Sequence, residues 1–219
     1  MDVSRRSIVN TLASGGGAAL GATFHLVGRI RPAAKPLHPR GRVLRATLVR
    51  RGLAVPTGVR WLDQPGVDEL VVRVSRAMGL PDGLPDIHGL ALRVPRVSGR
   101  DGDLLFATTG RGRITRYTLT PARAAQRRPL TTLLPYRTPT GPLLLAAFPR
   151  GGGRFDLACA APRGDWRVFA ELTLGDDLLP DADPTISFDP MLNTVPGLEP
   201  YEWVRRLREG AYAEARRTR

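Results

Sequence analysis

Cysteine is nearly absent from this sequence of 219 residues, in which Cys159 stands alone. One thiol cannot close an internal disulfide or build a thiolate zinc site, so we expect Cys159 to be a small buried residue of the core. Long apolar runs are missing too, since no window approaches the roughly 18 apolar residues of a membrane-spanning helix. These absences exclude a disulfide scaffold and predict a protein with no membrane span.

Lysine and aromatic residues are scarce as well. Lys35 is the only lysine among 33 basic residues, and aromatic residues make up 6% of the chain. A formal net charge of +13 would ordinarily suggest a polyanionic partner. An excess confined to arginine is more typical of coding bias, however, and no aromatic residues interleave with a basic run. We therefore do not expect a nucleic acid partner.

Histidine is too rare for several classes of hydrolase. Only His25, His38 and His88 are present, and Asp86 with His88 has the spacing of a single metal-ligand pair. A two-metal phosphoesterase needs more ligands than this. The sequence also has no Gly-x-Ser-x-Gly elbow, phosphate-binding Walker loop or His-Glu-x-x-His motif. We expect His25 and His88 to be structural.

Residues 1–30 differ in texture from the rest of the chain, and two interpretations of them stay open. Residues 4–9 (SRRSIV), followed by a weakly hydrophobic Gly/Ala stretch, are typical of a twin-arginine export signal. The alternative is an amphipathic helix that packs onto the body and is interrupted by the glycines of residues 14–17. We expect a cytoplasmic protein, with export as the alternative outcome.

The body of the chain, residues 31–200, reads as short strands separated by turn residues. Their spacing favours an antiparallel sheet that closes on itself. Residues 201–219 have apolar positions at steps of three and four, which predict a C-terminal amphipathic helix. The fold class we expect is α+β, mainly β: a closed antiparallel β-barrel with N-terminal and C-terminal helices. The expected strands are 43–50, 69–75, 89–94, 103–108, 143–148, 154–161 and 166–174.

Five short segments resemble motifs of the heme-dependent catalases. Residues 37–41 (LHPRG), 72–75 (VRVS), 88–94 (HGLALRV) and 103–109 (DLLFATT) are similar, in order, to the V-H-x-x-G, V-R-F-S, R-G-x-A-x-K-F and D-L-x-x-N-N-T segments of that family. The fifth match follows the spacing R-x-F-x-Y-x-D-x-x-R-x-R. Its residues are Arg208, Tyr212, Glu214, Arg217 and Arg219, with Glu in place of Asp and Gly210 in place of Phe.

The resemblance implies a catalase-like barrel that binds heme b, with Tyr212 as the ligand of the heme iron. Arg208 lies four residues before Tyr212, so on a helix its guanidinium sits beside the phenol and favours the ionised form. Arg73 and Arg219 would pair with the two heme propionates, because guanidinium groups bind carboxylates in a bidentate way. These four residues form the expected cofactor-binding set.

On the other heme face the resemblance implies three catalytic residues. His38 would accept a proton from the peroxide and return it to the departing oxygen, and Ser75 would orient His38 by hydrogen bonding. Thr108 stands where the family has an asparagine that helps to hold peroxide. We therefore expect weak hydrogen peroxide dismutation, with peroxidase or hydroperoxide-directed oxidation as the main activity.

Two further expectations concern enclosure and the alternative function. The sequence given ends at Arg219, shortly after the tyrosine motif, so we expect a bound heme to be less enclosed than in the family or to be covered by a second subunit of a homo-oligomer. The alternative is that the barrel holds no heme and binds a small apolar or lipid-like molecule instead.

Overall fold

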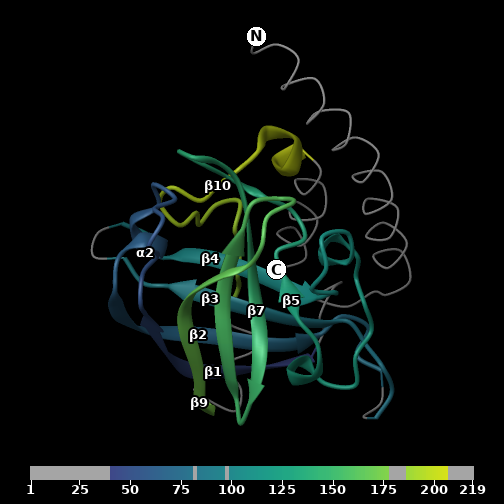
Figure 1. The fold of residues 1–219 in the computed structure, drawn as a ribbon. Coiled ribbons are helices and arrows are strands. Elements are labelled where there is room, and N and C mark those ends of the chain that lie inside the picture. Colours follow the sequence, from purple (N-terminus) through teal and green to yellow (C-terminus); the bar gives the residue numbers. More distant parts are fainter. Residues whose placement is uncertain (1–39, 81–82, 97–98, 178–185, 207–219) are drawn as a thin grey trace.

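The computed structural model describes residues 40–80, 83–96, 99–177 and 186–206, which form a mainly β structure (Figure 1). All seven expected strands are present, and most extend a few residues beyond the predicted bounds. The strands are β1 (Arg40–Arg50), β2 (Gly66–Arg76), β3 (His88–Val94), β4 (Gly102–Thr108), β5 (Leu130–Thr131), β6 (Tyr136–Thr138), β7 (Gly141–Gly151), β8 (Arg154–Ala160), β9 (Arg167–Asp177) and β10 (Glu199–Pro200).

Eight of these strands close into an antiparallel barrel. The neighbours run β5-β4-β3-β2-β1-β9-β8, and β7 pairs with both β5 and β8, which joins the two edges. In Figure 1, β1 to β4 run across the view while β7 and β9 cross in front of them. The short strands β6 and β10 extend one end of β7. Closure removes the exposed sheet edges that would otherwise pair with other chains.

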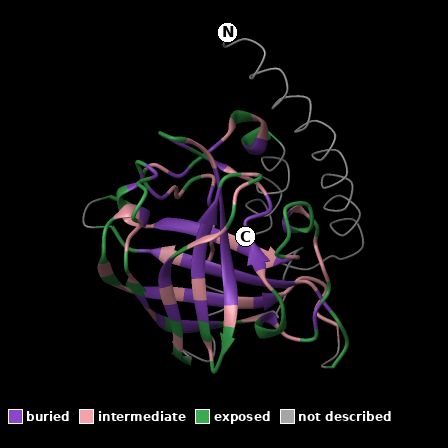
Figure 2. Ribbon diagram, in the orientation of Figure 1, coloured by how far each residue is buried: buried purple, intermediate pink, exposed green. Residues whose placement is uncertain are grey.

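Alternation along the strands separates an inner face from an outer face. In β2, Val72 pairs with Leu92 of β3, which pairs with Leu104 of β4, and all three belong to one buried cluster. On each strand, the residues directly before and after these three point out of the barrel. Buried positions therefore run along the centres of the strands in Figure 2.

The barrel interior is filled with side chains. Members of the inner cluster from seven different strands have almost no accessible surface, so they border no void large enough for a water molecule. These residues are Leu48, Val72, Leu92, Leu130, Ala147, Phe155, Leu157 and Leu172, with at most 1% exposed. Complete filling is the usual state of an eight-stranded barrel of this kind. A ligand at the centre of this barrel would have to displace core side chains.

Cys159 lies on β8 within this interior, as predicted. Its side chain is fully buried, and desolvation by burial raises the pKa of the thiol to about 11. The thiolate is therefore negligible near neutral pH, and Cys159 acts as an apolar core residue.

One end of the barrel is closed by a short helix that sequence reasoning did not predict, α2 (Arg60–Asp63). Val59 and Leu62 insert into the core from this segment and are almost completely buried. The Asp63 carboxylate holds the preceding loop by accepting hydrogen bonds from the backbone N–H groups of Thr57 and Gly58, both at 2.8 Å. A single charged side chain thus fixes the plug.

The β7–β8 hairpin turns through three glycines. Gly151, Gly152 and Gly153 have φ angles of 81°, 57° and 75°, in the left-handed region that glycine adopts without steric cost.

At the C-terminal end of the described chain, residues 202–206 are helical and lie within the predicted C-terminal helix. In the part of the chain that the structure describes, no helix is long and apolar enough to cross a membrane.

Candidate functional site

The candidate site is built on the outer face of β2, β3 and β4. Arg73 and Ser75 lie two residues apart on β2, so their side chains share that face, and they are only 8% and 6% exposed. Two of the expected site residues are therefore brought together, on the side of the sheet opposite the core. Both make further contacts, so neither is an isolated polar group.

Small residues surround Ser75 across four strands. Its register partners are Gly41 on β1 and Gly89 on β3, and Gly89 pairs in turn with Ala107 on β4. At the usual strand spacing this row is about 14 Å long. No side chain larger than that of serine rises from it, which leaves a flat strip of backbone. Ser75 and Gly89 of this row are themselves buried.

Arg73 is fixed at one end of this row by Gly41. A Cβ atom on Gly41 would lie 2.8 Å from both Cζ and Nη2 of Arg73, closer than real contacts allow. The guanidinium therefore packs flat against the Gly41 backbone, in a space that only glycine leaves open. This packing places the Arg73 guanidinium near the start of β1. Gly41 itself lies three residues after His38 in the sequence.

An ion pair lies farther along the same outer face, four residues from the row on both β3 and β4. Arg93 of β3 pairs with Asp103 of β4, with Nε 3.0 Å from Oδ1, and the Arg93 guanidinium lies 4.8 Å above the ring of Phe188. Asp103 also accepts hydrogen bonds from the Asp189 backbone N–H and the Asn193 amide, both at 2.8 Å. Asp103 thus fastens residues 187–193 onto the sheet near the end of β3, away from the small-residue row.

Thr108 is not part of this face. Because strand residues alternate, the β4 residue on the side of Ser75 is Ala107, and Thr108 points into the barrel. Its side chain is completely buried, and its Oγ1 accepts a hydrogen bond of 3.1 Å from the His88 backbone N–H. The Thr108 hydroxyl therefore lies on the opposite face of the sheet from Arg73 and Ser75, and its distal role stays a prediction from the resemblance.

His88 and Asp86 have structural contacts, in keeping with the role expected of His88. The Nε2–H of His88 donates to the Ala122 carbonyl at 2.9 Å, and desolvation by burial lowers the pKa of the ring. The Asp86 carboxylate accepts hydrogen bonds from the backbone N–H groups of Met78, Leu80 and Ile87. Both groups hold together the chain segments at the end of the barrel where β2 ends and β3 begins. Among the described residues, no cluster of three metal-ligating side chains is found.

The remaining expected site residues lie outside the described residues. They are His38, Arg208, Tyr212 and Arg219, and the same holds for His25 and for the segment 1–30 with its two interpretations. The structure thus describes the barrel side of the expected heme site. The tyrosine side stays a prediction from the resemblance.

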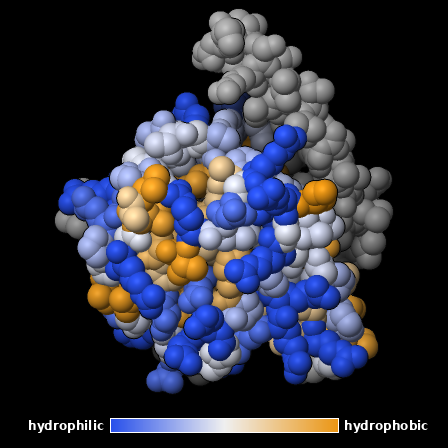
Figure 3. Space-filling model, viewed as in Figure 1, coloured by the Kyte–Doolittle hydropathy of each residue, from blue (hydrophilic) through white to orange (hydrophobic). Residues whose placement is uncertain are grey.

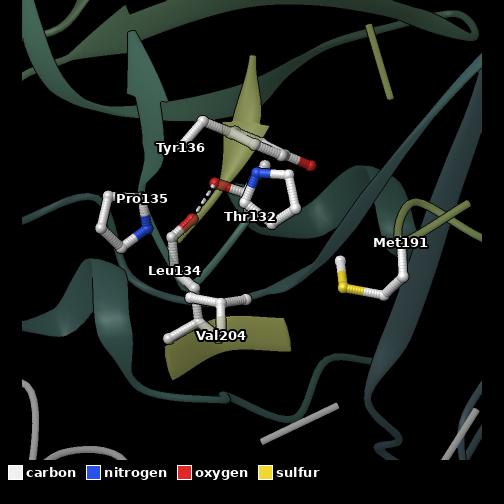
Figure 4. Close-up of a pocket in the computed structure, with 7 residues that line it drawn as sticks. Thr132, Leu134, Pro135, Tyr136, Met191 and Val204 are labelled. Atoms are coloured by element: carbon white, nitrogen blue, oxygen red, sulfur yellow. Dashed lines mark hydrogen bonds between the residues drawn. The ribbon is translucent and has the colours of Figure 1, made fainter. Parts of the chain in front are cut away.

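A small cavity lies elsewhere, between β6 and the helical residues 202–206. Figure 4 shows Met191 and Val204 pointing into it, with the Thr132 hydroxyl donating to the Leu134 carbonyl at its wall. Its volume of about 10 Å³ holds one water molecule at most. This cavity is too small to be a substrate site.

Sequence reasoning missed two features of the site. The Gly41 contact with Arg73 joins residues from different strands, and only the β1–β2 register reveals it. The Asp103 contacts depend on residues far along the chain, for which the sequence offers no local signal.

In the comparisons with known proteins, no protein-family model matches the chain and no curated protein matches it significantly.

Proposed function

We propose that the outer face of β2, β3 and β4 binds heme b and that the protein oxidises a donor at the expense of a peroxide or hydroperoxide. The observation that carries this proposal is the buried guanidinium of Arg73, fixed against Gly41 at the end of a flat row of small residues. The residues present suit a planar dicarboxylate. In the proposal the small side chains of the row would face the porphyrin, and Arg73 would supply one cation for a carboxylate at its edge.

Each residue has a defined task in this proposal. Bound heme would supply the iron that cleaves the peroxide O–O bond. Arg73 and Arg219 bind the propionates, and Tyr212 with Arg208 beside it provides the iron ligand. His38 moves the proton between the two peroxide oxygens, held in place by Ser75. These roles of the residues outside the described part rest on the family resemblance.

Weak dismutation of hydrogen peroxide is part of the proposal. Dismutation requires a second peroxide to be held and oxidised, which asks more of distal hydrogen bonding than removing one electron from an outside donor. On the proposed ligand face β4 presents the methyl group of Ala107, which donates no hydrogen bond. We therefore expect donor peroxidation to exceed oxygen evolution.

The test is the absorption spectrum of protein expressed with a heme supply. Wild-type protein should purify with a heme band, and Tyr212→Phe should lose or shift that band. Tyr117→Phe is the matched control, because the Tyr117 hydroxyl only donates to the Pro162 carbonyl at 2.8 Å. A colourless wild-type protein, or unchanged heme uptake by Tyr212→Phe, would contradict the proposal.

A further inference from the structure

Ile114 is the most exposed large apolar side chain in the described part of the molecule, with 83% of its surface open to solvent. It stands at the tip of a loop between β4 and β5, just before the short helix η1 (Thr115–Tyr117). An exposed isoleucine gives the folded monomer no stabilisation from burial. Its position therefore needs another explanation if the loop holds it there firmly.

The loop is held firmly by the buried side chain of Arg116. This guanidinium is 2% exposed, lies 4.4 Å above the Trp166 ring and donates to the carbonyls of Gly112 and Gly164 at 3.1 Å each. A buried arginine with carbonyl partners on two loops fixes both of them. Ile114 is thus presented outward by a rigid support.

A second loop, residues 161–166, lies beside the first one. The Tyr117 hydroxyl donates to the Pro162 carbonyl at 2.8 Å, and the indole N–H of Trp166 donates to the Arg111 carbonyl at 2.9 Å. We name residues 110–117 and 161–166 together the Ile114 loop pair. Its contacts make the pair one structural unit with Ile114 at its tip.

The charge around Ile114 is almost entirely positive. From residue 104 to residue 155 the sequence has nine arginines and no aspartate or glutamate. Within the Ile114 loop pair, Arg111, Arg113 and Arg163 are exposed, and only Asp165 opposes them, 3.3 Å from Arg113 in an exposed ion pair. Exposed ion pairs contribute little, so the loop pair presents a net positive surface.

We propose that the Ile114 loop pair docks the protein onto an anionic lipid surface, with Ile114 inserted among the lipids and the arginines paired with their phosphates. An apolar tip on a loop pair that carries exposed arginines matches the two terms of interfacial binding, which are apolar burial and attraction to anionic headgroups. Charge complementarity favours this partner over a neutral surface, and the aliphatic tip favours lipid over nucleic acid, because isoleucine cannot stack on bases.

Apolar side chains are also exposed away from the loop pair. Figure 3 shows polar side chains over most of one face, with apolar side chains gathered near β9. Val67 on β2 is also 67% exposed, but its register partner is Val49 on β1, and it is not part of the loop pair. Val67 therefore serves as a control with similar exposure.

The first test is sedimentation of the full-length protein with vesicles of phosphatidylcholine, with and without phosphatidylserine. Wild-type protein should sediment with the anionic vesicles and be released by salt. Ile114→Ser should lower the partition coefficient about tenfold, the scale of losing one buried aliphatic side chain. Arg163→Ser should lower it about fivefold, and Val67→Ser and Arg45→Ser should leave it unchanged.

The second test reports insertion directly. Ile114→Cys is labelled with a polarity-sensitive fluorophore, and Cys159 stays unlabelled because it is buried with its pKa raised to about 11. Emission should shift to the blue on adding anionic vesicles, whereas the same label on Val67→Cys should not respond. Lack of vesicle binding by wild-type protein would overturn the proposal. Equal losses in Val67→Ser and Ile114→Ser, or salt-dependent binding to duplex DNA without vesicle binding, would overturn it too.

Discussion

The inner and outer faces of β2, β3 and β4 are made by the same strands but have different contents. The inner face carries Leu and Val side chains with almost no exposed surface, as in the row of Val72, Leu92 and Leu104. The outer face carries the small residues beside Ser75 together with Arg73, and it ends at the ion pair of Asp103. The inner face is the more deeply buried of the two, and only the outer one combines charged groups with a row of small residues.

This difference separates the residues that stabilise the fold from those that our proposal assigns to heme binding. Apolar side chains on the inner face contribute free energy by burial and close packing. Polar and small residues on the outer face contribute little by burial, and glycine within a strand weakens it. Stability therefore does not explain why Gly41 and Gly89 occupy these strands. In our proposal, glycine at these positions lets heme approach the sheet closely.

The largest expected effect follows from opening a void on the inner face. Leu92→Ala should lower the free energy of unfolding by about 4 kcal/mol, because Leu92 is completely buried among other core side chains. Leu105→Ala, on the half-buried outer face, should cost about 1 kcal/mol. Urea denaturation measures both, and equal losses would remove the distinction between the faces.

The next largest effect concerns the Asp103 carboxylate. Asp103→Asn should lower the free energy of unfolding by about 3 kcal/mol, since Arg93 would lose the anionic partner beside it while remaining mostly buried. Residues 187–193 should also become more accessible, which limited proteolysis can detect. Asp101→Asn, on the exposed turn before β4, is the control and should behave like wild type.

A smaller effect is expected at Gly41, where a methyl group would displace the flexible end of Arg73. Gly41→Ala should leave stability within about 1 kcal/mol of wild type and lower hemin affinity about tenfold, through loss of one charge-assisted contact. The double variant with Arg73→Ala should bind no more weakly than Arg73→Ala alone, because both changes remove the same interaction. An additive loss would mean that Gly41 acts in another way.

The smallest effect is a pH dependence at His88. Burial lowers the pKa of His88 in the folded protein, so the unfolded chain binds a proton more readily. Stability is then complete above the unfolded pKa of about 6.5 and falls as the pH drops below that value. His88→Gln should show a shallower loss of melting temperature between neutral and mildly acidic pH. Identical slopes in the two proteins would rule out this contribution.

Most strands of the barrel could be predicted from the sequence, but two of its elements could not. Long strands such as β1, β2 and β9 carry enough β-favouring residues to reveal themselves. Strand β5 has only two residues, Leu130 and Thr131, too few for any periodicity, although it is needed to close the barrel. The plug at α2 was missed because four residues give no helical repeat.

The site was predictable only in part, because motif letters do not fix the face of a strand. Arg73 and Ser75 lie two residues apart on β2, so their side chains share a face. Thr108 and Ala107 are neighbours in the sequence but lie on opposite faces, and only the β3–β4 register tells them apart. A register shift of one residue would move every side chain of the strand to the opposite face of the sheet.

The most direct measurement is a titration of the purified full-length protein with hemin, comparing Ala107→Phe and Thr108→Val. Ala107→Phe places a large ring on the small-residue row and should reduce hemin affinity at least tenfold. Thr108→Val changes only a side chain inside the barrel and should leave the affinity within about twofold, at a modest cost in stability. Loss of hemin binding in Thr108→Val, with Ala107→Phe unaffected, would show that the ligand does not lie on the outer face.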